Sequence, residues 1–232
     1  MQIPEEFRGA FDLILADPNW SYQNFTEAVH GAAKNHYVCA GLDSLLALGP
    51  TVRAISSPDD AILGLWGTWP KADEHHKVYP VWGFEYVTGF PWVKVTPSSG
   101  AIRRGIGFWQ QSVSEFMSVC RLGNPKRKKL DKQIMGLLVG EERQFYDRVR
   151  AHSEKPYGIH EWFEEMFPTA RKAELFATKE RAGWTCLGHK TGWHLDPSGL
   201  YSLDQAKELG LVAKEYDPHT WDPKRKQEES VS

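Results

Sequence analysis

The chain has 232 residues with 28 basic and 30 acidic side chains, which gives a formal net charge of -2 at pH 7. This near balance excludes a global basic field for nucleic acid, so any contact with nucleic acid must be local. The length predicts one α/β domain with appendages and excludes a chain too short to bury a sizeable core. The cysteines Cys39, Cys120 and Cys186 are widely spaced. Such spacing gives no disulfide framework and is typical of a reducing cytoplasm.

The beginning of the chain shows no export signal. Residues 1–6 contain no basic segment followed by an apolar one. No uninterrupted apolar stretch is long enough to span a bilayer. We therefore expect a soluble, cytoplasmic protein without a membrane partner.

Strands alternate with helical stretches along the chain, without an internal repeat. Apolar runs predict strands over residues 11–16, 61–66, 84–95, 114–122 and 172–177, with 84–95 interpreted as a strand pair interrupted by Gly89. Helical patterns cover residues 42–48, 71–79 and 156–166. This alternation predicts an α/β fold, with a mostly parallel sheet and helices on both faces. From about Leu195 the sequence turns polar, so we expect a domain over residues 1–194 and a polar, partly mobile extension over 195–232.

The residues Asp17, Pro18, Asn19 and Trp20 follow directly after the first predicted strand. An acid at the carboxyl end of a buried strand points into the crevice where open α/β sheets bind ligands, and a proline stiffens the loop. The Asp17 carboxylate and a main-chain carbonyl can accept the two protons of an exocyclic amine, while Trp20 can stack on the ring. The loop therefore suits a flat substrate that bears an amine. Ordinary turn chemistry, with Trp20 in the core, is the alternative.

Further motifs follow this loop in the order seen in one enzyme family. They include Trp92-Val93-Lys94, Ser153-Glu154-Lys155-Pro156 and Glu174-Leu175-Phe176-Ala177, together with residues 36–37, 63–68, 82–86, 105–109, 115, 183–184 and 187–188. Over residues 11–190 the chain resembles the adenine N6-methyltransferases of the MT-A70-like family, whose best-known member is the catalytic subunit of the messenger-RNA adenosine methyltransferase. The resemblance points to the bacterial and phage DNA-modifying branch.

The resemblance implies an S-adenosylmethionine-dependent enzyme that methylates the N6 amine of adenine. The implied fold is a single Rossmann-like methyltransferase domain, permuted in the β-class motif order, in which the catalytic strand precedes the cofactor-binding strand. Carried over by position, Asp17 and the Pro18 carbonyl accept from the target amine, Asn19 completes the catalytic loop, and Trp20 stacks on the base. Such a transfer requires in-line positioning and no metal.

The later motifs are implied to hold the cofactor. Lys155 would supply a compact positive charge near its acidic part, and Glu174 would accept from the ribose hydroxyls. The implied cofactor-binding residues are Lys155, Glu174, Phe176, Thr178, His189 and Lys190.

Four residues depart from the family pattern within the expected crevice. Asn19 replaces a second proline, Gln111 and Thr178 each replace an arginine, and His189 replaces an asparagine. These changes keep two alternatives open: a relative that transfers a different group to adenine, and a non-catalytic subunit that binds nucleic acid or a partner.

A local basic loop indicates the acceptor. Lys126, Arg127, Lys128 and Lys129 can track a phosphate backbone, although a solvated surface run fits the charges equally well. DNA is favoured over RNA because the chain shows no Cys-rich zinc module or separate RNA-binding segment. RNA stays an alternative, and both a monomer and a homodimer are open.

In duplex DNA the target adenine must be flipped out of the helix to reach the pocket. Trp66, Trp69 and Trp109 are candidates for the walls of that pocket. The spacing of histidines with cysteines and acids does not indicate a metal site.

Overall fold

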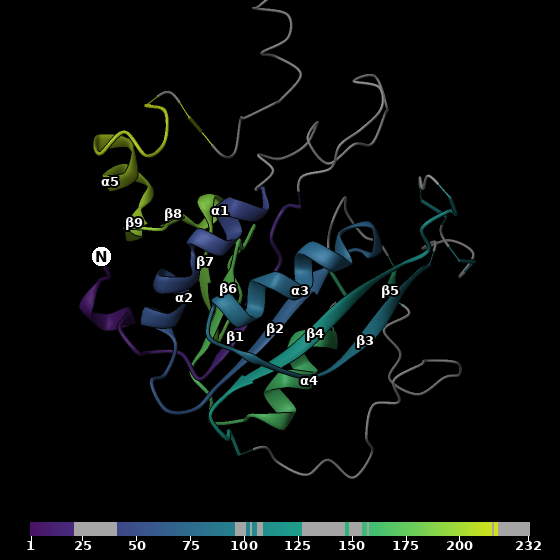
Figure 1. Cartoon of the computed structure of the whole chain (residues 1–232). Helices are drawn as coiled ribbons and strands as arrows, with labels where there is room; N and C mark the ends of the chain where they lie inside the picture. Colours follow the sequence, from purple (N-terminus) through teal and green to yellow (C-terminus); the bar gives the residue numbers. More distant parts are fainter. Residues whose placement is uncertain are drawn as a thin grey trace, which may run out of the picture.

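The computed structural model describes residues 1–20, 41–95, 101–102, 104–105, 109–126, 147–148, 155–156, 158–214 and 216–217. Within these residues a seven-stranded sheet has the order β5-β3-β4-β2-β1-β6-β7 (Figure 1). Its strands are β1 (Leu13–Ala16), β2 (Ala61–Gly67), β3 (Glu85–Val95), β4 (Ser114–Leu122), β5 (Asp147–Arg148), β6 (Lys172–Leu175) and β7 (Thr185–Leu187).

The sheet is mostly parallel, as the sequence predicted. β1 pairs in parallel with β2 on one side and with β6 on the other, and β6 pairs in parallel with β7. β4 is antiparallel to both of its neighbours, β2 and β3. The carboxyl ends of β2, β1, β6 and β7 therefore lie along one edge of the sheet.

Helices and 3₁₀ turns connect the strands of the described chain. The helices are α1 (Leu42–Ala47), α2 (Gly49–Ile55), α3 (Ala72–Val81), α4 (Gly158–Met166) and α5 (Leu203–Glu208), and the 3₁₀ turns are η1 (Glu5–Phe7), η3 (Trp69–Lys71) and η4 (His189–Thr191). The predicted helices over 42–48, 71–79 and 156–166 correspond to α1, α3 and α4, although α4 begins after Pro156. No helix among the described residues has the length and apolar character needed to cross a membrane.

Side chains of β1 alternate between two hydrophobic clusters, because successive residues of a strand point to opposite faces. Ile14 and Ala16 belong to a cluster with residues of α1, α2 and α3. Leu13 and Leu15 belong to a second cluster with residues of α4. The strand that leads to Asp17 is thus buried on both faces, which fixes the position of the loop that follows.

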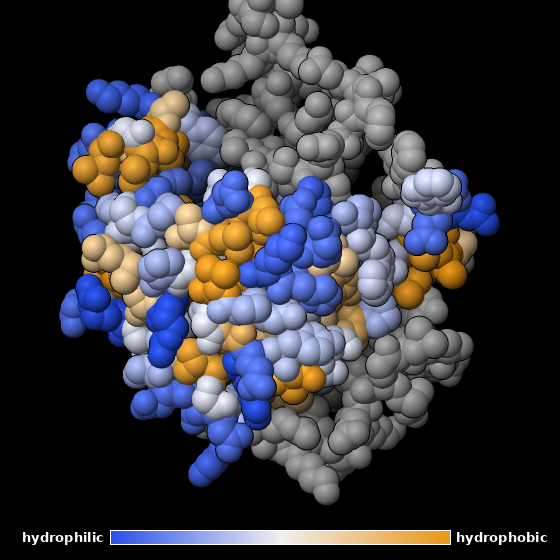
Figure 2. All heavy atoms as spheres, in the orientation of Figure 1, coloured by the Kyte–Doolittle hydropathy of each residue, from blue (hydrophilic) through white to orange (hydrophobic). Residues whose placement is uncertain are grey.

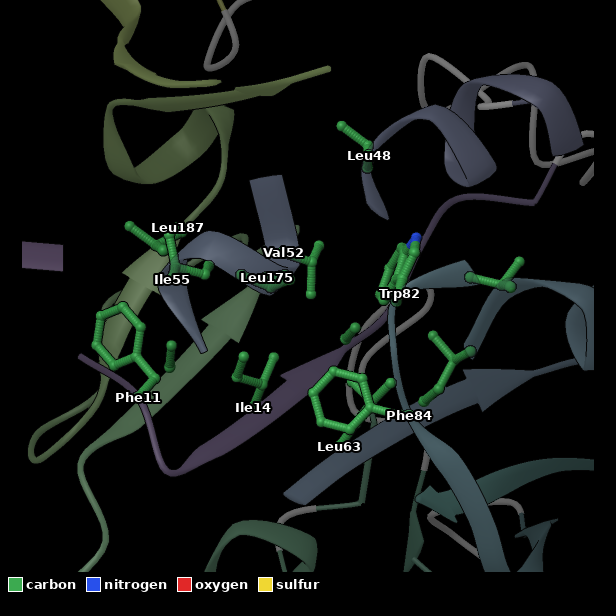
Figure 3. Close-up of a cluster of buried hydrophobic side chains, with 14 of the residues drawn as sticks. Phe11, Ile14, Leu48, Val52, Ile55, Leu63, Trp82, Phe84, Leu175 and Leu187 are labelled. Carbon is green, nitrogen blue, oxygen red and sulfur yellow. The ribbon is translucent and has the colours of Figure 1, made fainter. Parts of the chain in front are cut away.

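Figure 3 shows the first cluster, in which Ile14 of β1 lies towards Val52 and Ile55 of α2, and Leu63 of β2 lies beside Phe84. Trp82 anchors the end of α3 in this cluster, where its indole N–H donates to the Leu45 carbonyl at 2.7 Å. The side chains of Ile14, Leu63, Val52, Ile55 and Trp82 are all fully buried, and Leu45 is buried with them. The helices that follow β1 and β2 are therefore held by packing rather than by their own short length.

The predicted strand pair over residues 84–95 is wrong, because β3 is one continuous strand. It carries an irregularity in its pairing with β4 between Tyr86 and Thr88, and Gly89 lies inside it. A Cβ at Gly89 would approach the Met117 carbonyl oxygen at 2.7 Å. The glycine marks a close approach of two backbones rather than a turn.

The polar segment after Leu195 begins with regular secondary structure. β8 (Trp193–Asp196) and β9 (Gly199–Ser202) form an antiparallel hairpin, and α5 follows directly. The chain start pairs with this hairpin, since Gln2 N–H donates to the Ser198 carbonyl at 2.8 Å. The proposed boundary at residue 194 falls inside β8, and the division into domain and extension stays a prediction.

This polar segment contributes buried side chains at Leu200, Tyr201 and Ala206, and its helix has a capped start. Ser202 and Gln205 form a reciprocal capping box at the start of α5. Figure 2 shows hydrophobic side chains gathered over this helix, where Leu209 and Leu211 are exposed. Residues from 218 onward lie outside the described part of the chain.

Candidate active site at the carboxyl edge of the sheet

Sequence motifs far apart in the chain meet at the carboxyl edge of the parallel strands (Figure 1). Asp17 directly follows β1, and Glu174 lies in β6 opposite Leu15. Gly188 follows β7, and its Cβ position would lie 2.3 Å from the Ala177 carbonyl oxygen. This edge is where open α/β sheets bind their ligands.

Asp17 is the first of four charged side chains that alternate in sign and contact one another in a row. Lys155 Nζ lies 2.8 Å from Asp17 Oδ2 and 3.3 Å from Glu115 Oε2. Lys94 donates to the other carboxylate oxygen of Glu115. Three of the four side chains are at most 28 % exposed, and Asp17 is 29 % exposed at the crevice. The order Asp17–Lys155–Glu115–Lys94 gives each inner residue two opposite partners.

The two lysines of this chain of charges each lie over the ring of a tryptophan. Lys155 Nζ lies 5.6 Å from the centre of the Trp66 ring, and Lys94 Nζ lies 5.2 Å from that of Trp92. The two rings meet edge to face at 5.9 Å. Both lysines therefore gain cation–π attraction in addition to their ion pairs.

The environment shifts the pKa values of these groups in opposite directions. Burial raises the pKa of Asp17, the cation of Lys155 opposes this, and the charges of Glu115 and Glu174 add to the rise. Burial also acts to raise the pKa of Glu115, but the two lysines outweigh it and lower that pKa. Burial acts to lower the pKa of Lys155, and its two carboxylate partners raise it instead. The charge of Glu174 reaches Asp17 because the two acids lie on or just after neighbouring parallel strands.

The catalytic-loop residues predicted from the sequence differ in exposure. Asn19 is partly exposed and Pro18 is buried. Trp20 is only 4 % exposed, and its indole N–H donates to the Trp66 carbonyl at 3.2 Å. Its ring also packs against His75 at 5.8 Å. Stacking of a base on Trp20 would require its ring to be uncovered.

His75 is the buried residue that packs against Trp20 of this loop. Its Nε2 lies 3.2 Å from the Leu65 carbonyl oxygen, and the residue is fully buried. Burial lowers the pKa of His75 to about 4, so the ring is neutral at neutral pH and Nε2–H donates to Leu65. Gly67 is required beside it, because a Cβ there would lie 2.5 Å from the His75 ring.

The predicted ribose-binding residue, Glu174, is oriented by a histidine. Glu174 Oε2 lies 2.9 Å from His160 Nε2, and the carboxylate side chain is 25 % exposed. Phe176, two residues further on, has a φ of 61°, which is rare for a residue with a side chain. Strained backbone of this kind occurs preferentially at ligand sites.

The remaining predicted cofactor residues are less directly placed. Thr178 and Lys190 are exposed. His189 is partly buried, and both of its ring nitrogens have protein partners: Nδ1 is 3.0 Å from the Tyr216 hydroxyl and Nε2 is 2.8 Å from His194 Nδ1. The imidazole of His189 therefore has no free nitrogen for a ligand while these bonds persist.

Of the predicted nucleic-acid contacts, the structure describes only Lys126, which is exposed. Arg127, Lys128 and Lys129 lie outside the described residues. Among the predicted wall residues, Trp66 is buried, whereas Trp69 is 50 % exposed just after β2. The Trp69 indole N–H donates to Ser114 Oγ at 2.8 Å, which holds the exposed ring in place.

Sequence reasoning missed the roles of Lys94, Glu115 and His160. Lys94 and Glu115 belong to family-like motifs but carried no assigned function, and they complete the chain of charges. His160 stands in a predicted helix without any motif around it. Only the packing of α4 against β6 reveals its partner.

Comparison with known proteins identifies the family of the chain. The family model for MT-A70 matches residues 11–190. The chain is 28 % identical to the type II methyltransferase M.MunI of Mycoplasma sp over 206 residues, which covers 80 % of this chain and 79 % of that protein. It is also 28 % identical to the Arabidopsis thaliana N(6)-adenosine-methyltransferase MT-A70-like protein, where the match covers 83 % of this chain but only 25 % of the plant protein.

A third relative, the N6-methyladenosine RNA methyltransferase MTA1 of Cryphonectria parasitica, is 25 % identical over 187 residues. That match covers 77 % of this chain and 51 % of the fungal protein. S-adenosylmethionine, the cofactor expected from the motifs, is the cofactor of this family of N6-adenine methyltransferases. With the family model covering most of its length, the chain belongs to the MT-A70 family.

Proposed function

We propose that this protein transfers the methyl group of S-adenosylmethionine to the exocyclic N6 amine of adenine in DNA, in the cytoplasm. The observation that carries the proposal is the Asp17 carboxylate, held 2.8 Å from Lys155 Nζ at the carboxyl edge of the sheet. Glu174 stands on the adjacent strand, so the group proposed to receive the amine and the group proposed to hold the cofactor lie near one edge of the sheet.

The proposed fold is a permuted methyltransferase sheet with helices on both faces. In chain order the strand of Asp17 comes before the strand of Glu174, as the β-class motif order requires. The two core clusters support the covered sheet, because one contains residues of α1 to α3 and the other residues of α4.

Asp17 and the main chain beside it orient the target amine. An ionised Asp17 accepts a hydrogen bond from one N–H of the amine, and the Pro18 carbonyl accepts one from the other N–H. These two bonds orient the nitrogen lone pair towards the methyl donor. Lys155 favours the ionised form of Asp17 against the effect of burial. Glu115 shares Lys155 with Asp17, so the lysine is fixed at the point where the amine must arrive.

The carboxylate of Glu174 suits the ribose of the family cofactor. When bound, S-adenosylmethionine supplies an electrophilic methyl group. Glu174 offers a partly exposed carboxylate for ribose hydroxyls, and Gly188 packs closely against the backbone of residues 176–177 beside it. We assign Phe176, Thr178, His189 and Lys190 to its surroundings, with His189 acting through packing rather than through its engaged ring nitrogens.

DNA is the proposed acceptor because of the extent of the matches. M.MunI, a type II methyltransferase, matches the chain over 79 % of its own length, whereas the plant MT-A70-like protein matches over only 25 %. The exposed Trp69, just after the carboxyl end of β2, supplies an aromatic face of the kind that extruded bases need. Lys126 follows the end of β4 that pairs with the amino end of β2, so it lies at the other edge of the sheet and does not support this proposal. RNA is the second candidate acceptor, since the fungal relative carries RNA methylation in its name.

The test is nucleoside mass spectrometry on DNA and RNA offered to the wild-type protein and to Asp17→Asn with S-adenosylmethionine. We expect N6-methyladenine in DNA with the wild type only. Methylation confined to RNA would overturn the DNA assignment. A heavier adenine adduct would indicate a different transferred group, and no product in either polymer would favour a non-catalytic relative.

A further inference from the structure

We propose that His160 is a positioning residue of the cofactor site, which holds one oxygen of Glu174 so that the other is presented to a ribose hydroxyl. This inference rests on the proposed function, because it concerns how the same carboxylate receives the cofactor. His160 belongs to α4, behind the crevice, and is not a residue of any motif that led to the family.

The contact between His160 and Glu174 is direct, and the histidine is buried. His160 Nε2 lies 2.9 Å from Glu174 Oε2, and the His160 side chain is only 8 % exposed. Its other ring nitrogen, Nδ1, is buried without a hydrogen-bond partner among the described residues. The hydrogen bonding of this imidazole is therefore directed at Glu174 alone, with Nε2–H as the donor.

A second pair of side chains prevents the imidazole from turning. The Trp184 ring meets the His160 ring edge-on, with centroids 4.9 Å apart and planes at 81°. The Trp184 indole N–H donates to Glu164 Oε1 at 2.6 Å, and Glu164 lies one turn further along α4. The helix that carries His160 thus also fixes the ring that packs against it.

Glu174 is consequently held in one orientation at the crevice. A glutamate on a strand can otherwise sample several rotamers, and a bond to one carboxylate oxygen selects among them. Oε2 is engaged by His160, and Oε1 has no hydrogen-bond partner among the residues that the structure describes, on a side chain that is 25 % exposed. A ribose diol is the ligand chemistry that matches a carboxylate presented in this way.

The experiment pairs changes in the protein with changes in the ligand. Binding of S-adenosylhomocysteine and of its 2′,3′-dideoxyribose analogue is measured by calorimetry for the wild type, His160→Phe and His160→Gln. Phenylalanine keeps the ring packed against Trp184 but cannot donate, whereas glutamine keeps an N–H donor near the place of Nε2.

We expect His160→Phe to weaken binding of S-adenosylhomocysteine about tenfold, which corresponds to about 1.4 kcal/mol, and His160→Gln to restore most of the loss. Binding of the dideoxy analogue should be the same for all three proteins, because it has no hydroxyl for Glu174. An equal loss for both ligands would show a general structural role and overturn the proposal. So would unchanged binding of S-adenosylhomocysteine to His160→Phe.

Glu174→Ala separates this inference from the function on which it rests. If Glu174→Ala weakens binding of S-adenosylhomocysteine but His160→Phe does not, only the positioning role of His160 fails. If neither variant weakens it, the assignment of Glu174 to the ribose fails as well. In turnover assays the loss in His160→Phe should be in KM for S-adenosylmethionine, with kcat for the bound complex nearly unchanged.

Discussion

The two ends of the crevice solve the problem of a partly buried acid in different ways. Asp17 is paired with a full positive charge, and the compensation extends through Glu115 to Lys94. Glu174 instead receives a hydrogen bond from an imidazole held by aromatic packing. A carboxylate that must exchange partners with an arriving amine is balanced by a cation that has a second anion to hold. A carboxylate that must keep one orientation is fixed by a rigid donor.

The same contrast continues around each acid. The Asp17 end contains lysines over tryptophan faces, where charge sets the energy of the site. On the cofactor side of the edge, His189 and His194 bond to each other, and burial lowers the pKa of His189 to about 4. The His189 ring is therefore neutral at physiological pH. A run of charges at one end and imidazoles with fixed partners at the other are the features that the following experiments test.

Asp17→Asn is expected to have the largest effect. Asparagine preserves the shape but lacks the negative charge that makes Asp17 a strong acceptor and pairs it with Lys155, so kcat should fall about 10²- to 10⁴-fold. The affinity for S-adenosylhomocysteine should change little, because the cofactor end does not depend on this charge. Single-turnover kinetics and calorimetry measure the two quantities. Retained turnover would remove Asp17 from the chemistry, whereas equal losses in both would mean that the two ends are coupled.

Acid should weaken the fold through the buried neutral histidines. The pKa of His75 is lowered from 6.5 to about 4, so the unfolded chain takes up the proton first as the pH falls. The stability contributed by the neutral ring is complete above pH 6.5 and is lost as the pH falls towards 4, by on the order of 3 kcal/mol. The lowered pKa of Glu115 adds a loss below pH 4.5, and the raised pKa of Asp17 acts with the opposite sign.

Urea unfolding between pH 4 and 7 checks this prediction. His75→Gln, which can still donate to the Leu65 carbonyl but does not titrate, should flatten the dependence of the unfolding free energy on pH. His76→Gln is the matched control, because His76 is the exposed neighbour on the same helix. An equal flattening in both variants would contradict the assignment to the buried ring.

Glu115→Gln tests whether the chain of charges acts as a unit. The change leaves Lys155 with Asp17 as its single anionic partner and should tighten that pair, which competes with the target amine. We expect kcat to fall about 10- to 100-fold with the cofactor affinity unchanged. Glu85→Gln is the control: Glu85 pairs with Arg121 across the same two strands but is 72 % exposed, and an exposed pair contributes at most about 1 kcal/mol. Similar losses from both variants would refute the special role of Glu115.

The sequence predicted the parts of this molecule that depend on local pattern. The runs that became β1, β2 and β4 and the helix α1 follow from apolar spacing and turn residues, and the acid after β1 indicated the crevice. The continuous β3 was missed because a glycine at position 89 is typical of a turn. The glycine is needed for another reason: the Met117 backbone on the adjacent strand leaves no room for a Cβ there. The β8–β9 hairpin was missed because its sequence is polar. Backbone hydrogen bonds to Gln2, at the start of the chain, stabilise it.

Site residues followed the same division. Asp17, Lys155 and Glu174 stand in motifs, and the parallel register brings them to one edge. The partner of His160 lies 14 positions away on another element, and the contact exists only when α4 packs on the sheet. Hydrogen-bond partners set by tertiary packing leave no periodic signal in a single sequence.

The smallest expected effect comes from Tyr216→Phe at the cofactor end. The change removes the hydroxyl that lies 3.0 Å from His189 Nδ1 and should lower the unfolding free energy by about 1 kcal/mol. If His189 acts by packing, the affinity for S-adenosylhomocysteine should stay within about twofold. A marked gain in affinity would mean that the freed nitrogen bonds the cofactor. In that case the His189 nitrogen would take the role of the family asparagine. The affinity for the cofactor would then depend on the hydrogen-bond partners of His189, as turnover depends on the charge of Asp17.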